Sequence, residues 1–222
     1  REVGVPAGVI NFVTGPGGVV GDTMVTHPKT RFVSFTGSKE VGIHINELAA
    51  KVQPGQKWLK RVVAEMGGKD SIVIDDQTDL DAAAQATVAS AFGFQGQKCS
   101  AASRAIVVDK VYDKFVNLVK EKVRAIKVGP SDEPLNYMGP VVNRGSRDKI
   151  IAYVEKGLRE GGRLVAGGGR VEGEGYYIQP TIIADVEPGA TISQEEIFGP
   201  VLAVIKAKDF DHALEIANNT EY

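Results

Sequence analysis

The sequence predicts an α/β fold, and two observations carry this prediction. Apolar runs of strand length alternate along the chain with longer segments whose apolar residues keep helical spacing. Clusters of glycine and proline separate most of these segments, as expected for turns between strands and helices. Such alternation is typical of sheets covered by helices.

The first third of the chain contains the first four predicted strands. The apolar run at residues 9–13 ends at a glycine- and proline-rich turn, residues 14–18. A second turn precedes a helix, and the hydroxyl of Ser38 is a suitable N-cap for that helix. In chain order we expect a strand at 9–13, a helix at 19–26, a strand at 31–35, a helix from 38 to about 51, and strands at 60–64 and 71–74.

The remainder of the chain alternates in the same way. Thr78 and Asp81 match a capping box, in which Thr78 is the N-cap and Asp81 satisfies a free amide. The helix that they open extends to about Phe92. We then expect irregular structure at 94–103, a strand at 104–108, helices around 111–126 and 150–158, a hairpin between the glycine turns 167–169 and 173–175, strands at 176–183 and 200–206, and a helix at 210–217.

The charge balance gives no indication of a nucleic-acid or membrane partner. The chain has 222 residues, 26 of them basic and 28 acidic, for a net charge of -2. A nearly neutral chain lacks the basic surface that such partners require. No apolar run approaches the roughly 20 residues needed to span a bilayer. The first residues also show no signal-peptide pattern.

The single cysteine, Cys99, excludes an internal disulfide and suits a reducing, cytoplasmic location. A zinc site is not expected, because one cysteine and three dispersed histidines, His27, His44 and His212, lack metal-site spacing. We therefore predict no metal.

The first stretch with chemical potential lies between a strand and a helix, at residues 35–42. Thr36, Gly37 and Ser38 open the helix, whose N-terminal amides and dipole favour a phosphate. Glycine would let a pyrophosphate approach the backbone. Glycine turns of this kind are common, so a turn without a ligand is also consistent with the pattern.

The second stretch is Glu65 followed by Met66, Gly67 and Gly68. Glu65 ends a predicted strand, and active sites in open α/β sheets gather beyond the carboxyl ends of strands. Its carboxylate could serve as a general base. Taken alone, a solvated glutamate near a hinge is the simpler interpretation.

The third stretch is the glycine-containing loop that holds Cys99. Lys98 precedes the cysteine, and a serine- and alanine-rich segment follows it. Reactive cysteines need a partly open, electropositive setting, whereas structural cysteines are usually buried in apolar runs. On this pattern alone, both a reactive and an inert cysteine remain open.

Taken together, these stretches closely resemble the aldehyde dehydrogenase superfamily, over essentially the whole chain. The matching segments are residues 35–38, 65–69, 96–99 and 195–200, in the family's order and spacing. The resemblance implies that Cys99 attacks the aldehyde to form a thiohemiacetal and then a thioester, with its own amide as one oxyanion donor. Glu65 would then activate the water that releases the acid.

The resemblance also implies an NAD cofactor, with NADP left open. Glu196 would bind the nicotinamide ribose, and Phe198 would steady the ring. Each could instead be a turn carboxylate or a packing residue. The other cofactor-binding residues implied by the resemblance are Thr36, Gly37, Ser38, Gly17, Gly21, Met66 and Gly67.

Within the family, the cysteine loop is similar to that of bacterial 1-pyrroline-5-carboxylate dehydrogenases, which oxidise L-glutamate γ-semialdehyde to glutamate in proline and arginine breakdown. A polar substrate would suit Ser100, although its hydroxyl could simply bond its own backbone. Two alternatives remain open: another enzyme of the family, such as a succinate semialdehyde dehydrogenase, and an inactive truncated domain that only binds or assembles.

The ends of the sequence look like those of a segment from a longer chain. The resemblance places the C-terminal half of a Rossmann-like NAD(P)-binding domain in residues 1–66. It places most of an α/β, thiol-bearing catalytic domain, incomplete at its C-terminus, in residues 67–222. It also implies that an asparagine donor to the oxyanion and the region choosing NAD or NADP lie upstream. We therefore expect little activity from the isolated segment, and a homo-oligomer for the full protein.

Overall fold

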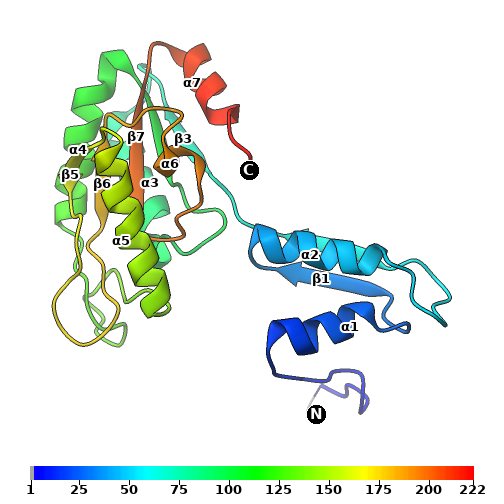
Figure 1. Cartoon of the computed structure of the whole chain (residues 1–222). Coiled ribbons are helices and arrows are strands. Elements are labelled where there is room, and N and C mark those ends of the chain that lie inside the picture. Colours follow the sequence, from blue (N-terminus) through cyan, green and yellow to red (C-terminus); the bar gives the residue numbers. More distant parts are fainter. Residues whose placement is uncertain (1–2) are drawn as a thin grey trace. The chain divides into compact units, whose positions relative to one another are not determined.

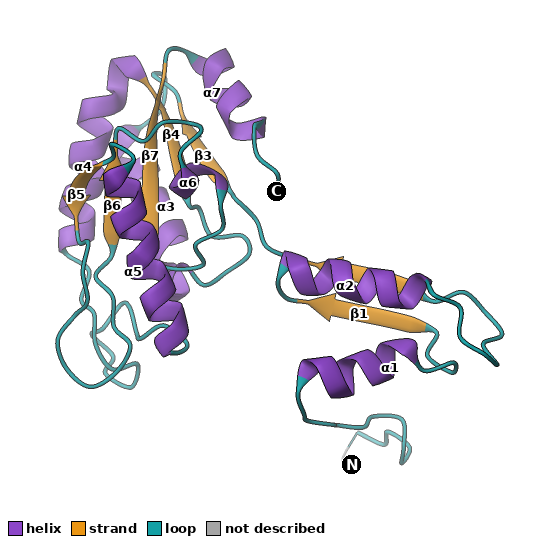
Figure 2. Cartoon of the chain, viewed as in Figure 1, coloured by secondary structure: helices purple, strands orange, loops and turns teal. Residues whose placement is uncertain are grey.

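A computed structural model describes residues 3–222 and confirms the α/β fold. The chain divides into two compact units, unit 1 (Arg1–Gly67) and unit 2 (Gly68–Tyr222). Each unit has its own sheet with helices against it (Figures 1 and 2). None of the helices within residues 3–222 is long and apolar enough to cross a membrane.

Unit 1 is built on a parallel pair of short strands. Strand β1 (Phe32–Thr36) pairs with β2 (Arg61–Glu65), and Thr36 lies opposite Glu65. Ser38 caps α2 as predicted, since its side chain accepts a hydrogen bond from the Val41 amide. The helices of unit 1 are a π-helical turn (Gly17–Gly21), α1 (Asp22–Thr26) and α2 (Lys39–Ala50), and its buried core is Val25, Ile45 and Ala49.

The predicted strand at residues 9–13 is wrong. These residues form no strand, and Val9, Ile10, Phe12 and Val13 are all more than half exposed. A strand needs a neighbour for its backbone groups, and no strand among residues 3–222 pairs with this run. The apolar pattern identified side chains that favour burial, but it did not supply the partner.

Unit 2 contains a five-stranded sheet in the order β3-β4-β7-β6-β5. All pairs are parallel except β5 with β6, which is antiparallel at one edge. The strands are β3 (Ser71–Ile74), β4 (Arg104–Val108), β5 (Arg163–Ala166), β6 (Thr181–Ala184) and β7 (Val201–Ala207). The helices are α3 (Leu80–Phe92), α4 (Tyr112–Arg124), α5 (Arg144–Arg159), α6 (Thr191–Gln194) and α7 (Phe210–Asn218), with 3-10 turns at Gly93–Gly96 and Asp109–Val111.

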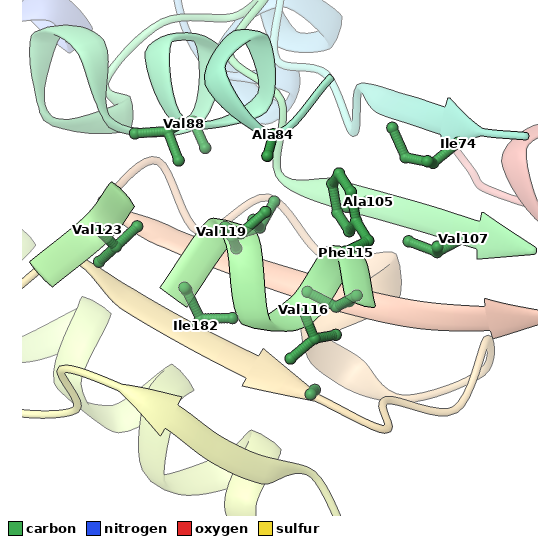
Figure 3. Packing of buried hydrophobic residues seen from close by; sticks show 14 of the residues in the cluster. Ile74, Ala84, Val88, Ala105, Val107, Phe115, Val116, Val119, Val123 and Ile182 are labelled. Carbon is green, nitrogen blue, oxygen red and sulfur yellow. The ribbon is translucent and has the colours of Figure 1, made fainter. Parts of the chain in front are cut away.

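Helices cover both faces of this sheet. On one face, Ala105 and Val107 of β4 pack with α3 and α4, including Phe115 (Figure 3). On the other face, Ile106 packs with residues of α5, α6 and α7. Burial on both sides explains why β4 is a continuous apolar run after its first residue rather than an alternating one.

Two further local predictions need correction. The N-cap of α3 is Asp79 and not Thr78, because the Asp79 carboxylate accepts from the amides of Asp81 and Ala82. The strand expected at 176–183 begins only at Thr181. Pro180 has no amide to donate to a ladder, and the preceding residues contribute only an isolated antiparallel bridge between Arg170 and Ile178 within the expected hairpin.

Candidate active site

In unit 1, three of the candidate residues meet at the carboxyl end of the parallel strands. Thr36 and Glu65 are the last residues of β1 and β2 and lie opposite each other. The amide of Gly37 donates a 3.0 Å hydrogen bond to the carbonyl oxygen of Glu65. The Glu65 side chain is exposed. The carboxylate therefore stands at a sheet end fixed by backbone hydrogen bonds, available to a reactant.

Met66 follows Glu65 and packs against α2. A Cβ atom at Gly42 would lie 2.5 Å from the Met66 Sδ and 2.9 Å from its Cγ, so the Met66 side chain lies closely against α2 at this glycine. Gly67, next along the chain, is partly buried. The segment after Glu65 is thus held by packing rather than free.

Unit 1 also contains an open hollow of about 840 Å³ beside α1, α2 and β1. Its lining is mostly apolar and includes Val41, Ile45 and the predicted cofactor-binding residues Gly17 and Gly21. A Cβ atom at either glycine would meet nothing within 4 Å. Contacts within residues 3–222 therefore do not require glycine at positions 17 and 21, and the space beside them can admit a flat ring.

In unit 2, Cys99 lies exposed in a tight turn between α3 and β4. The Ala101 amide donates to the Lys98 carbonyl at 3.2 Å and closes this turn. The Ala102 amide donates to the Ser90 hydroxyl of α3 at 3.1 Å. Within residues 3–222, the Cys99 amide donates to no backbone carbonyl. The thiol is thus accessible, on a turn whose position is fixed.

The backbone of the segment that precedes Cys99 is strained. Phe94, Gln95 and Gly96 have φ angles of 53°, 59° and 65°, a region that residues other than glycine rarely adopt. The Gln97 side chain accepts a 3.0 Å hydrogen bond from the Val142 amide and holds the loop from the other side. Strain of this kind persists only where surrounding contacts enforce it, and it often marks functional sites.

Three predicted segments meet at the amino ends of β3, β4 and β7. A Cβ atom at Gly68 would lie 2.7 Å from the Cys99 carbonyl oxygen. The Gly68 amide donates to Glu196 Oε1 at 3.3 Å. Gly96 leaves no room for a side chain against the Gly199 carbonyl. Gly68, the cysteine loop and the segment from Glu196 to Gly199 therefore form one closely packed site within unit 2.

Two further predicted residues, Phe198 and Ser100, also belong to unit 2. Phe198 has φ of 58° and is 42% exposed. It lines a small hollow together with Gly68, Lys98 and Glu196. Ser100 is exposed next to Cys99 in sequence. A planar ligand could pack on the exposed ring while a polar group reached Glu196.

Replacing Gly96 by alanine should destabilise the protein and disturb Cys99. The new Cβ would combine a positive φ with a clash against the Gly199 carbonyl, at a cost of about 3 kcal/mol or more. Gly161→Ala is the matched control, because Gly161 has φ of 100° but nothing within 4 Å of its Cβ position. Urea unfolding would measure both, and equal losses would contradict the close packing at Gly96.

Sequence reasoning missed two buried charges beside the site, Lys69 and Arg104, which are 3% and 1% exposed. Arg104 donates to the carbonyl oxygens of Lys69, Ile216 and Ala217. A signal for Arg104 was present, since a charged residue that opens a buried strand must find acceptors. The arginine ties the end of α7 to the segment after the double glycine.

Lys69 stands in an unusual electrostatic setting. Burial, followed by the nearby positive charge of Arg104, lowers the pKa of Lys69 to about 7, and Glu196 and Glu195 partly offset this. Its Nζ is fully buried and has no hydrogen-bond partner within residues 3–222. Elsewhere, the described residues contain no group of three or more His, Cys, Asp or Glu side chains placed to hold a metal ion.

Comparison with known proteins shows the family of the chain. The model of the aldehyde dehydrogenase family matches residues 1–222. The chain is 61% identical to a protein named 1-pyrroline-5-carboxylate dehydrogenase from Geobacillus thermodenitrificans, and 57% identical to one of the same name from Bacillus subtilis. In both cases the match covers 100% of this chain and 43% of the relative.

Among solved structures, the fold matches 1-pyrroline-5-carboxylate dehydrogenase from Thermus with bound NAD, at a TM-score of 0.96 and 51% identity. That match covers 100% of this chain and 42% of the other. The chain thus spans less than half the length of the relatives that it matches. With the family model covering all 222 residues, the chain belongs to the aldehyde dehydrogenase family.

Proposed function

We propose that the protein containing this chain oxidises L-glutamate γ-semialdehyde to L-glutamate with NAD, as a step in proline and arginine breakdown. The observation that carries the proposal is the match, at 57–61% identity over the whole chain, to proteins named 1-pyrroline-5-carboxylate dehydrogenase. The imine ring of 1-pyrroline-5-carboxylate opens by adding water, and this gives L-glutamate γ-semialdehyde. The reaction consumes aldehyde, water and NAD⁺ and yields the acid, NADH and a proton.

Cys99 is the proposed nucleophile. Its thiolate would add to the aldehyde carbon and form a carbon–sulfur bond, which leaves a negative charge on the former carbonyl oxygen. The Cys99 amide, without a backbone acceptor of its own within residues 3–222, would donate to that oxygen. The exposed turn supports this role, because a substrate can reach the sulfur without displacing protein.

Glu65 is the proposed general base. After oxidation, the acyl group would be held on Cys99 as a thioester, which water must cleave. Glu65 would take a proton from that water, so that hydroxide character develops at the attacking oxygen. Its exposed carboxylate at the end of β2 supports the assignment, since a buried carboxylate could not reach a solvent molecule.

The residues present fit an NAD cofactor. Glu196 has one carboxylate oxygen anchored on the Gly68 amide, which leaves the other for ribose hydroxyls. The exposed ring of Phe198 offers a surface for the nicotinamide, and the hollow beside Gly17 and Gly21 suits an adenine. When bound, NAD supplies the hydride acceptor. We assign the remaining contacts to Thr36, Gly37, Ser38, Met66 and Gly67.

Three finer assignments complete the proposal. Ser100 would contact the polar end of the substrate, which its exposed position beside Cys99 supports. A reducing compartment, the cytoplasm, would keep the exposed thiol active. Assembly as a homo-oligomer rests on the family resemblance.

The substrate is tested by measuring NADH formation by the full-length protein. We expect kcat/KM for glutamate γ-semialdehyde to exceed that for succinate semialdehyde and for aliphatic aldehydes by about 100-fold, because a missing polar contact leaves site groups unpaired. A higher kcat/KM for an aliphatic aldehyde would contradict the proposed substrate, but it would still be consistent with NAD-dependent oxidation of an aldehyde. Absence of NADH with every aldehyde would contradict the function as a whole.

A further inference from the structure

The buried side chain of Lys69 has no explanation in the fold. Its ammonium is enclosed, yet Nζ makes no hydrogen bond to residues 3–222. A buried polar group without a partner costs stability, and a buried charge costs more. A methionine of similar length would fill the same space at no such cost. Features that oppose stability in this way are usually retained for function.

The backbone around Lys69 is rigid. Its carbonyl oxygen accepts from Arg104 Nε at 3.0 Å and from Nη2 at 2.6 Å. On one side of Lys69, the Asp70 carbonyl accepts from the amides of Ser103 and Arg104 at 3.1 and 3.2 Å. These hydrogen bonds fix the Lys69 carbonyl and the peptide that follows it, so the point from which the side chain extends is constant.

The charges that act on Lys69 indicate which group its ammonium can influence. Arg104 opposes the ammonium, whereas the carboxylates of Glu196 and Glu195 favour it. Glu195 already accepts a 2.7 Å hydrogen bond from the Tyr153 hydroxyl. Within residues 3–222, the Glu196 side chain accepts by contrast a single hydrogen bond, from the amide of Gly68, the residue that precedes Lys69. The less satisfied carboxylate is therefore the one that the lysine can orient.

We propose that Lys69 is a positioning residue: when protonated, its buried ammonium fixes the ionised Glu196 carboxylate in the orientation that receives the ribose hydroxyls of the cofactor. The inference rests on the proposed function and deepens it. Lys69 itself does not touch the ligand, and its effect passes through Glu196. The gain in cofactor binding offsets the loss of stability that the orphaned ammonium causes.

The test is a double-mutant cycle on the full-length protein, read by NAD binding with isothermal titration calorimetry and by Tm. Lys69→Met should weaken NAD binding by about tenfold, a factor typical of one well-placed interaction. Glu196→Gln should weaken it by at least as much. Because Lys69 acts through Glu196, adding Lys69→Met to Glu196→Gln should change the Kd by less than about twofold. The Tm of Lys69→Met should be higher than that of the wild type.

Lys110→Met is the control, since Lys110 is an exposed lysine paired with Asp76 at the opposite end of the strands. It should change neither Kd nor Tm appreciably. Unchanged NAD binding in Lys69→Met, losses that add in the double variant, or weaker binding together with a lower Tm would each overturn the inference. A wild type that binds no NAD would contradict the proposed function first, and this inference with it.

Discussion

Replacing Cys99 by alanine should lower the turnover of aldehyde to acid by at least about 10⁴-fold, since removal of a covalent nucleophile eliminates the path through the thioester. The exposed turn that presents Cys99 is held by the Ser90 hydroxyl and the Lys98 carbonyl. Neither contact involves the sulfur, so the fold should persist. Steady-state NADH formation by the full-length variant measures the effect.

The control for this variant is cofactor binding. NAD should bind Cys99→Ala with a Kd within about twofold of the wild type, a difference that corresponds to less than 0.5 kcal/mol. Alkylation of Cys99 by iodoacetamide, located by peptide mapping, should likewise abolish the activity of the wild type, because the Cys99 thiol is exposed. Residual turnover above one tenth of the wild-type rate would place the chemistry elsewhere.

Replacing Glu65 by glutamine should separate the two halves of the reaction. Steady-state turnover should fall by about 10³-fold, within the range typical of a lost general base. The first turnover should persist, because oxidation of the thiohemiacetal does not use Glu65 as base. Stopped-flow fluorescence should therefore record a burst of about one NADH per active site, as expected when an acyl-enzyme accumulates.

Glu47→Gln provides the comparison, because Glu47 is an exposed carboxylate on α2 of the same unit. That variant should turn over at the wild-type rate. Loss of the burst in Glu65→Gln would mean that Glu65 acts before or during oxidation, for example by deprotonating Cys99. A normal steady-state rate would exclude Glu65 as the base altogether.

The sequence could predict those parts of the fold that depend on local patterns. Strand β4 lies at the residues where a strand is predicted, 104–108, and its burial on both faces is consistent with its continuous apolar run. Ser38 was identified as an N-cap because its hydroxyl precedes a helical pattern. The position of Glu65 at a strand end followed from the same kind of reasoning.

Features that depend on a partner could not be predicted in this way. Residues 9–13 carry the apolar pattern of a strand, but no neighbour among the described residues pairs with them. Thr78 and Asp79 both have capping side chains, and only the geometry showed that Asp79 supplies the oxygen. Local propensity ranks such candidates and does not decide between adjacent ones.

The residues that surround Cys99 in the fold also could not be predicted from the sequence. In unit 2 the candidate site lies at the amino ends of β3, β4 and β7, although the carboxyl ends of strands are the usual location. Gly68 and Glu196 are 128 residues apart in the sequence, and both meet the segment around Cys99 only through tertiary contacts. Lys69 and Arg104 belong to this tertiary arrangement, which no local pattern records.

The most direct test of the central claim is peptide mass mapping of the full-length Glu65→Gln variant after mixing with NAD and glutamate γ-semialdehyde. If Cys99 is the nucleophile and Glu65 the base, the peptide containing Cys99 should carry one acyl group, released by hydroxylamine as expected for a thioester. An acyl group on another residue, or no covalent product despite NADH formation, would contradict the account.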